Sequence, residues 1–267
     1  MTATDDSLSL LSDLVAKAKK AGADAADAVH FSSTGLSHAQ RLGAPERLER
    51  EESQDVGLRV LLGKRQAIVS STDLAQDSLD ELVERALAMA KVVPEDPYCG
   101  LAEAGELAIE VPDLDILDSE EPAPEVLIER ARACEEAARS VKGVTNSEGA
   151  EASWSRIEIA LVTSNGFARG YGRSGHSVGV SVIAGEGLGM ESDYDFASAV
   201  YGGELEDPAA VGRRAGERAV KRLGAKKPPT RRLPIIYDPR VSNSMLRHLA
   251  GAVSGPAIAR GTSFLKD

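Results

Sequence analysis

The sequence predicts an α+β fold, in which an N-terminal helix/sheet lobe is followed by a mainly antiparallel β lobe with flanking helices. Three observations predict it. Apolar residues recur at helical spacing in residues 8–21 and 75–92. From Val144 to Tyr201 apolar and polar residues instead alternate, and glycine is frequent. Between these two patterns lies the stretch 94–124, which holds five of the twelve prolines.

The N-terminal lobe is expected to open with a helix that Gly22 ends. Two strands follow it, Ala25–Ser33 and Gly35–Leu42. Residues Pro45–Asp55 are rich in arginine and glutamate. The sequence leaves two structures open for them, a short helix or a polar strand in a sheet with one wet face.

A β-hairpin is predicted where two apolar runs, Val56–Leu62 and Gln66–Ser71, flank a short turn containing glycine. Thr72 or Asp73 is expected to cap the helix that follows, residues 75–92. Structureless loops as long as residues 94–124 are unusual inside a compact domain. We therefore expect this stretch to connect two lobes over the surface.

The second lobe is expected to begin with a helix from Pro124 to about Val141. Five short antiparallel strands should follow, with a hairpin turn at residues 164–166 because Asn-Gly strongly favours such turns. These strands span Val144–Trp154, Arg156–Thr163, Gly166–Ser174, Ser177–Glu186 and Met190–Tyr201. A helix over residues 209–223 should close the lobe, begun by Asp207-Pro208 and ended by Gly224.

Residues 228–267 predict a short strand, Leu233–Tyr237, and a helix, Val241–Ser254. The sequence stops after Phe264 and Leu265 without a solvated tail, which suggests a truncated C-terminal domain. The expected domains are 1–93 (N-terminal α/β lobe), 94–124 (connector), 125–227 (helix and antiparallel sheet) and 228–267 (start of the truncated domain).

The charge balance argues against a nucleic-acid partner. The formal net charge is −11, and binding to a duplex requires clustered lysine and arginine to displace counterions from phosphates. The clearest basic cluster has two prolines between its basic residues, and we interpret it as a solvated linker. It consists of Lys226, Lys227, Arg231 and Arg232.

Other features indicate a cytoplasmic protein without a membrane partner. The longest apolar runs are far shorter than a membrane span, and residues 1–12 lack the basic and apolar regions of a signal peptide. The two cysteines, Cys99 and Cys134, form no CxxC pair and suggest neither a disulfide framework nor a thiolate zinc site.

The histidines are not spaced as the zinc-binding helix of a zinc protease requires. Such a helix needs two histidines on one face and a glutamate, whereas His30, His38, His176 and His248 are never three or four positions apart. His30 and His38 lie on neighbouring predicted strands and could meet across a hairpin; the alternative is two unconnected polar positions. No catalytic residue and no metal ligand is assigned.

One group of carboxylates is a candidate binding site. Glu191, Asp193 and Asp195 occupy alternate positions of a predicted strand, so their side chains should share one face. Such a face could bind a cation or the amine of a peptide. The alternative is a solvated sheet face.

Several segments, taken in order, resemble the TldD/PmbA family, also called TldD/TldE or "modulator of DNA gyrase" proteins. The resemblance covers essentially the whole chain. It is carried by residues 47–60 (RLEREESQDVGLRV), 147–149 (SEG), 163–166 (TSNG), 222–230 (RLGAKKPPT), 234–240 (PIIYDPR) and 259–266 (ARGTSFLK).

The resemblance implies paired subunits in the bacterial cytosol. A TldD-like subunit carries a zinc-binding HExxxH helix and cleaves unfolded peptides, and a PmbA or TldE-like subunit lacks that motif. Where the motif would fall, residues 241–255, this sequence has only His248, without a neighbouring glutamate. The resemblance therefore implies a PmbA/TldE-type chain that lacks the C-terminal domain.

The expected function is that of a PmbA/TldE-like subunit in a TldD/TldE-type metallopeptidase complex that processes or degrades unfolded peptides. Ser177–Ala184 or Met190–Val200 would hold the peptide by strand addition. No cofactor is expected in this chain; zinc is expected on a TldD-like partner, and the assembly is either that pair or a homodimer. Two alternatives stay open: an active metallopeptidase of the same family, and a modulator of DNA gyrase acting through protein contact.

Overall fold

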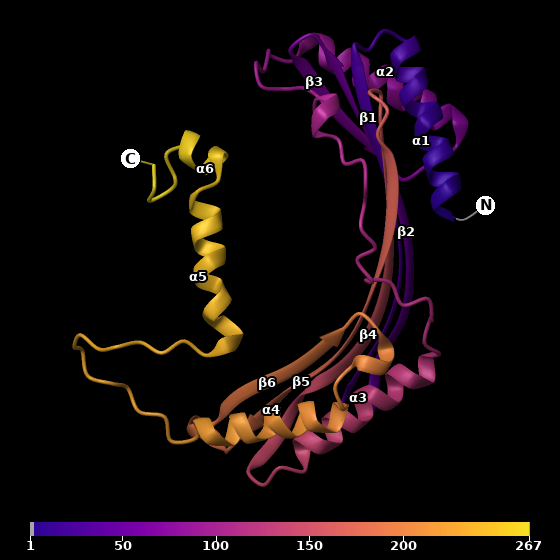
Figure 1. Cartoon of the computed structure of the whole chain (residues 1–267). Coiled ribbons are helices and arrows are strands. Elements are labelled where there is room, and N and C mark those ends of the chain that lie inside the picture. Colours follow the sequence, from indigo (N-terminus) through magenta and orange to yellow (C-terminus); the bar gives the residue numbers. More distant parts are fainter. Residues whose placement is uncertain (1–2, 267) are drawn as a thin grey trace. The chain divides into compact units, whose positions relative to one another are not determined.

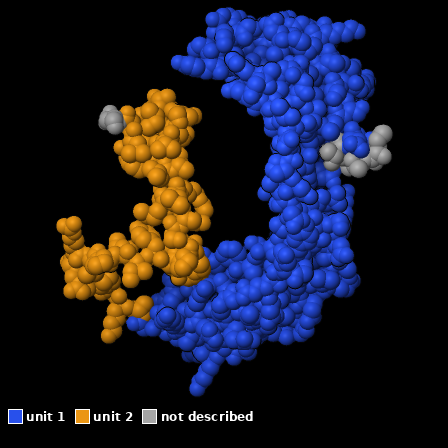
Figure 2. Space-filling view, in the orientation of Figure 1, with its two compact units in different colours: residues 1–224 blue, residues 225–267 orange. Residues whose placement is uncertain are grey.

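The structure, a computed structural model, describes residues 3–266 (Figure 1). The chain forms two compact units, Met1–Gly224 and Ala225–Asp267, coloured separately in Figure 2. Among the described residues, the first unit contains helices α1–α4 and one six-stranded sheet, which confirms the predicted α+β class. The second contains the helices α5 (Pro239–Ala252) and α6 (Gly255–Ala259).

The sheet is antiparallel throughout, in the order β3-β2-β1-β4-β5-β6. Its strands are β1 (Ala25–Arg41), β2 (Ala44–Leu62), β3 (Arg65–Ser71), β4 (Val144–Thr163), β5 (Ala168–Ala184) and β6 (Glu191–Ala199). A two-residue turn joins β1 to β2, with positive φ at Leu42 (54°) and Gly43 (80°). Positive φ at both central residues is the turn geometry that suits the twist of a hairpin.

Several strands are longer than the sequence predicted. Ala25–Ser33 and Gly35–Leu42 are one strand, and the breaks predicted within β4 and β5 are also absent from the described chain. Middle segments such as Ser32–Thr34 carry few apolar side chains, yet they pair with β2 and β4 on both sides. Their ladder hydrogen bonds hold them in the sheet without an apolar pattern.

Helices α1–α4 all pack on one face of this sheet. The buried apolar positions of β1 are Ala26 and Ala28 near one end and Leu36 near the other, all even-numbered. The buried apolar positions of β4 are likewise even-numbered. Because alternate residues of a strand share a face, the helices cover one face and leave the other without a helix.

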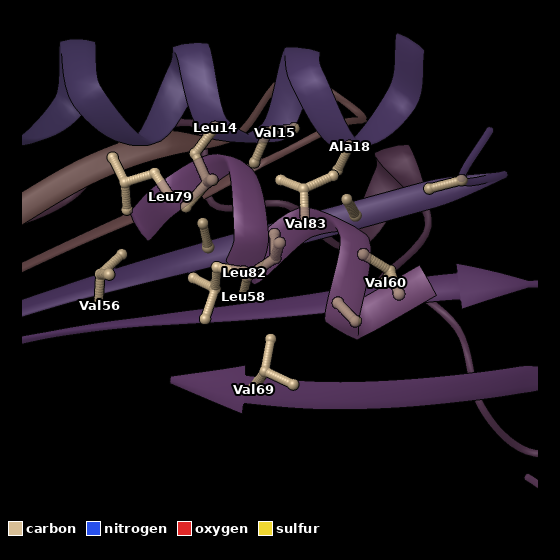
Figure 3. Packing of buried hydrophobic residues seen from close by; sticks show 14 of the residues in the cluster. Leu14, Val15, Ala18, Val56, Leu58, Val60, Val69, Leu79, Leu82 and Val83 are labelled. Carbon is tan, nitrogen blue, oxygen red and sulfur yellow. The ribbon is translucent and has the colours of Figure 1, made fainter. Parts of the chain in front are cut away.

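The first hydrophobic cluster joins α1 (Ala3–Lys20) and α2 (Gln76–Val92) to strands β1–β4. Figure 3 shows how the helices project leucine and valine side chains toward the strands. The labelled residues are Leu14, Val15, Ala18, Val56, Leu58, Val60, Val69, Leu79, Leu82 and Val83. Both helices lie where helical spacing predicted them, because that spacing produces the buried stripe.

The second cluster joins α3 (Pro124–Arg139) and α4 (Pro208–Arg222) to strands β1, β4 and β5. The two helices lie side by side over the sheet (Figure 1). A Cβ atom on Gly212 would lie 2.0 Å from the carbonyl oxygen of Cys134, and one on Gly216 would lie 2.7 Å from that of Ala138. Glycine thus permits an approach that any larger residue would prevent.

Local predictions were borne out in part. The hairpins at Gly63 and at residues 164–166 are confirmed, and Pro45–Asp55 forms a strand. Leu233–Tyr237 is not a strand. The N-cap of α2 is Ala75 rather than Thr72 or Asp73, although Asp73 accepts a hydrogen bond from the Ala75 amide. The domain bounds at 93, 124 and 227 stay a prediction.

The connector between α2 and α3 is irregular, as predicted, apart from a short 3-10 turn at Ala104–Glu106. Ser174 donates its amide hydrogen to the carbonyl oxygen of Ile116 in the connector. Asp118 accepts hydrogen bonds from the Gly202 amide and from His176, and so ties the connector to β5. Within the described residues, no helix is long and apolar enough to cross a membrane.

Candidate functional site

Strand β6 carries the three candidate carboxylates, and the structure places all three on the face that carries the helices. Asp193 and Asp195 are buried, and Glu191 is half-buried. The predicted common face is therefore confirmed. It faces α4 rather than open solvent, so the solvated-face alternative is wrong for the two aspartates.

A row of arginines on α4 pairs with these carboxylates. Asp195 binds Arg214 (Nε to Oδ2, 2.7 Å) and Arg218, and Arg222 lies 3.4 Å from Asp193 and 3.9 Å from Glu191. Four residues of a helix rise about 6 Å and two residues of a strand about 6.8 Å. Helical i,i+4 spacing therefore matches alternate strand positions.

One member of the arginine row, Arg214, also binds a fourth carboxylate, that of Glu206. Hydrogen bonds to Glu206 and to Asp195 raise the pKa of Arg214. The hydrogen bond from Arg214 in turn lowers the pKa of Glu206. The role of Glu191, Asp193 and Asp195 in peptide binding stays a prediction. Their visible contacts hold β6 against α4.

We expect Asp195→Asn to lower the free energy of unfolding by about 1–2 kcal/mol. Breaking a fully buried ion pair costs more, about 3–5 kcal/mol, but Arg214 and Arg218 are each about a third exposed and water screens them. Urea unfolding measures the change. Glu129→Gln, which removes an exposed partner of Arg132, is the control and should change little. Equal stability of wild type and Asp195→Asn would contradict a clamping role.

The opposite face of β6 carries an aromatic pair that the sequence analysis missed. Tyr194 and Phe196 are exposed and stacked, with ring centroids 6.4 Å apart. They border a hollow of about 710 Å³ on the sheet face without helices, which small residues of β5 such as Ser177, Gly179 and Ser181 also line. The sequence feature that could have revealed this pair is the alternation of acids at 193 and 195 with aromatic residues at 194 and 196.

Only one of the two strands predicted to receive a peptide is positioned for it. Ser177–Ala184 lies inside the sheet, paired with β4 and β6, so that assignment is wrong. Strand β6 ends the sheet order and therefore has an edge that no described strand occupies. Strand addition can use only such an edge.

A second polar cluster surrounds His176, which is buried. Its Nε2 lies 3.2 Å from Asp118 Oδ2, and its Nδ1 lies 3.3 Å from Arg130 Nη1. Burial and the Arg130 charge lower the pKa of His176, although Asp118 opposes them. The neutral ring then donates from Nε2 to Asp118 and accepts at Nδ1 from Arg130, which fixes one end of the connector.

The remaining histidines are dispersed. His30 and His38 lie on the same strand, so they do not meet across a hairpin and the alternative of two unconnected polar positions is confirmed. Ser7 Oγ lies 3.0 Å from His30 Nδ1, and burial lowers the pKa of His30. His248 is exposed on α5. Within residues 3–266, no three His, Cys, Asp or Glu side chains are grouped so that they could hold a metal ion.

Comparison with known proteins now defines the class. Residues 26–90 match the model of the PmbA/TldA metallopeptidase domain 1, and residues 117–223 match that of the PmbA/TldA metallopeptidase central domain. The two matched regions correspond to the first and the central domain of this protein family. The chain belongs to the PmbA/TldD family, which confirms the resemblance found in its sequence.

Curated relatives agree. The chain is 32% identical over 245 residues to "Metalloprotease PmbA" of Escherichia coli O157:H7, covering 91% of this chain and 54% of that protein. It is also 32% identical over 251 residues to the "Metalloprotease PmbA homolog" of Haemophilus influenzae, covering 94% and 55%. The chain thus spans about half the length of these relatives.

Solved structures share the fold. A proposed modulator of DNA gyrase from Bacteroides thetaiotaomicron superposes with a TM-score of 0.87 at 23% identity, covering 99% of this chain and 61% of that one. TldE from Thermococcus kodakarensis gives a TM-score of 0.69 at 18% identity, covering 79% and 47%. At these identities the likeness concerns the fold alone.

Proposed function

We propose that this chain is a PmbA/TldE-type subunit that works with a TldD-like partner in processing or degrading unfolded peptides in the cytoplasm. The observation that carries the proposal is the open edge of β6 in a protein of this family. An unfolded chain can add to such an edge through main-chain hydrogen bonds, whereas a folded chain has its peptide groups already paired.

Zinc in this proposal belongs to the TldD-like partner. The family resemblance supports that division, together with the sequence of α5, where His248 is followed by Leu249 and Ala250 and preceded by Arg247 and Leu246. These side chains offer one imidazole and no carboxylate to a metal ion. The catalytic step is accordingly assigned to the partner.

Co-purification tests the proposal. The chain and a TldD-like subunit are mixed at micromolar concentration and analysed by size-exclusion chromatography with light scattering. A joint species that cleaves an unfolded peptide, while this chain alone does not, is the expected result. Two separate species, or a homodimer that ignores the TldD-like subunit, would overturn it.

Metal analysis separates the subunit role from an active metallopeptidase. Stoichiometric, EDTA-sensitive zinc on the pure chain, together with peptide cleavage, would establish the second role.

The gyrase alternative is tested by a gel-shift experiment. The net charge of −11 predicts that the chain does not shift duplex DNA in a gel at any salt concentration. A salt-dependent shift would contradict an effect through protein contact alone.

A further inference from the structure

Hydrogen bonds made by the neighbouring strand β5 show in which direction the peptide groups of β6 point. Beyond the end of β6, the amide of Ser174 in β5 donates to Ile116 of the connector, away from β4. At the other end of β5, the Gly185 amide donates to Gly143 next to β4, and the carbonyl oxygen of Ile183 accepts from Thr145 of β4. Even-numbered residues of β5 therefore direct their peptide groups toward β6, and odd-numbered ones toward β4.

The register then fixes the edge. Val178, Val180 and Val182 pair with Ala197, Asp195 and Asp193, so the odd-numbered residues of β6 bond to β5. In an antiparallel ladder the residues between them direct both peptide groups outward. Ser192, Tyr194, Phe196 and Ser198 accordingly point their N–H and C=O groups away from the sheet. The Tyr194 amide already donates to Asp193 Oδ1 at 2.8 Å, whereas no described residue bonds there to the peptide groups of Ser192, Phe196 and Ser198.

The other edge in this part of the sheet, formed by β2, is protected against the pairing of a further strand, whereas β6 is not. Residues 44–55 of β2 extend beyond β3, and their side chains are nearly all exposed. Charges crowd this stretch: Glu46, Arg47, Glu49, Arg50, Glu51, Glu52 and Asp55. Proteins use such charges, bulges and prolines to prevent unwanted strand pairing.

Strand β6 lacks these protections along its outward positions. Its pairing with β5 is regular, without a bulge. The outward residues carry the side chains Ser192, Tyr194, Phe196 and Ser198, all uncharged and exposed on the face without helices. The acids of β6 lie on the other face, where arginines of α4 pair with them. An incoming chain therefore meets the peptide groups of Ser192, Phe196 and Ser198 beside an aromatic pair, while the Tyr194 amide is held by the Asp193 carboxylate.

We propose that the outer edge of β6 binds an extended peptide that carries apolar side chains at two alternate positions, opposite Tyr194 and Phe196, with hydrophilic residues between them. Directly opposed side chains in a sheet share a face and contact each other, and aromatic pairs with β-branched or aromatic residues are favourable. The hydrophilic residues would lie on the other face, beside the ion pairs of α4. This proposal rests on the peptide-binding part of the proposed function and on no other part of it.

Three synthetic peptides test the edge with the full chain alone, by fluorescence anisotropy. The first is an eight-residue peptide with valine and phenylalanine at two alternate positions among threonine, serine and lysine. The second has the same composition with the two apolar residues adjacent. The third is the first peptide with N-methyl groups on the amides that would face β6. We expect the first to bind about fivefold more tightly than the second and about tenfold more tightly than the third.

Two variants locate the binding. Phe196→Ala should weaken binding of the first peptide about fivefold, whereas Ile68→Ala, which removes an exposed apolar side chain on the opposite edge strand β3, should not. Equal affinity for all three peptides, or an unchanged affinity of Phe196→Ala, would overturn the proposal. So would a dimer that Phe196→Ala dissociates without any peptide binding, which would assign the edge to a second copy of the chain. No TldD-like subunit is present, so this result and the partner assay can fail independently.

Discussion

Gly212→Ala is expected to destabilise the first unit by about 3 kcal/mol or more. Helix propensity alone predicts the opposite, a gain of about 1 kcal/mol. Packing should outweigh it because the new Cβ would lie 2.0 Å from the Cys134 carbonyl oxygen and 2.9 Å from its carbon. These are backbone atoms of α3, so no side chain can turn aside and the two helices must separate.

Urea unfolding followed by circular dichroism measures this loss. Gly251→Ala in α5 is the matched control, since a Cβ there has no neighbouring atom within 4 Å. It should be neutral or stabilise its helix by up to about 1 kcal/mol. A wild-type midpoint for Gly212→Ala would show that α3 and α4 do not approach so closely.

The second large effect concerns Glu135, which is fully buried on α3. Its carboxylate accepts hydrogen bonds from the amides of Leu42 (2.7 Å) and Gly43 (2.9 Å) and from Gln40 Nε2 (2.9 Å). It thereby holds the turn between β1 and β2. Glu135→Ala should cost about 3–4 kcal/mol, because two backbone donors lose their acceptor and a cavity remains.

Glu135→Gln tests the charge separately through the pH dependence of stability. Burial raises the pKa of Glu135, but the hydrogen bonds from Ser147, Gln40, Gly43 and Leu42 together lower it below its usual value. A lowered pKa in the folded state stabilises the protein above the ordinary glutamate pKa, and this stabilisation is lost as the pH falls through the folded value. The variant should lose less stability on acidification than the wild type does.

Unfolding curves between neutral and acidic pH give this comparison. Glu136→Gln, the exposed neighbour that pairs with Arg132, is the control and should keep the wild-type pH dependence. An identical acid response of wild type and Glu135→Gln would mean that the carboxylate is not ionised in the folded protein.

Sequence alone predicted the helices well because their pattern results from burial. Leu79, Leu82, Val83, Ala86 and Leu87 repeat at helical spacing and form the buried stripe of α2. The Asn-Gly turn at residues 165–166 was equally direct, since Gly166 adopts a positive φ of 101°. Local chemistry decides both features, so neither requires knowledge of distant contacts.

The strand lengths and the site could not be predicted in the same way. The middle of β1, near Ser33, is a strand because two neighbours pair with it, and its own residues show no apolar alternation. Asp193 and Asp195 formed a visible alternation, but their partners lie about twenty to thirty residues later, on α4. Whether a row of acids faces water or arginines depends on which helix crosses the strand.

The continuity of β1 and β4 has a mechanical consequence. Each of these strands contributes buried residues to both hydrophobic clusters, through Ala28 and Leu36 in one and Ala160 and Ala152 in the other. Melting either cluster would therefore leave half-strands whose peptide groups have lost their neighbours. The first unit should behave as a single cooperative block, through which strain applied at one end is transmitted to the other.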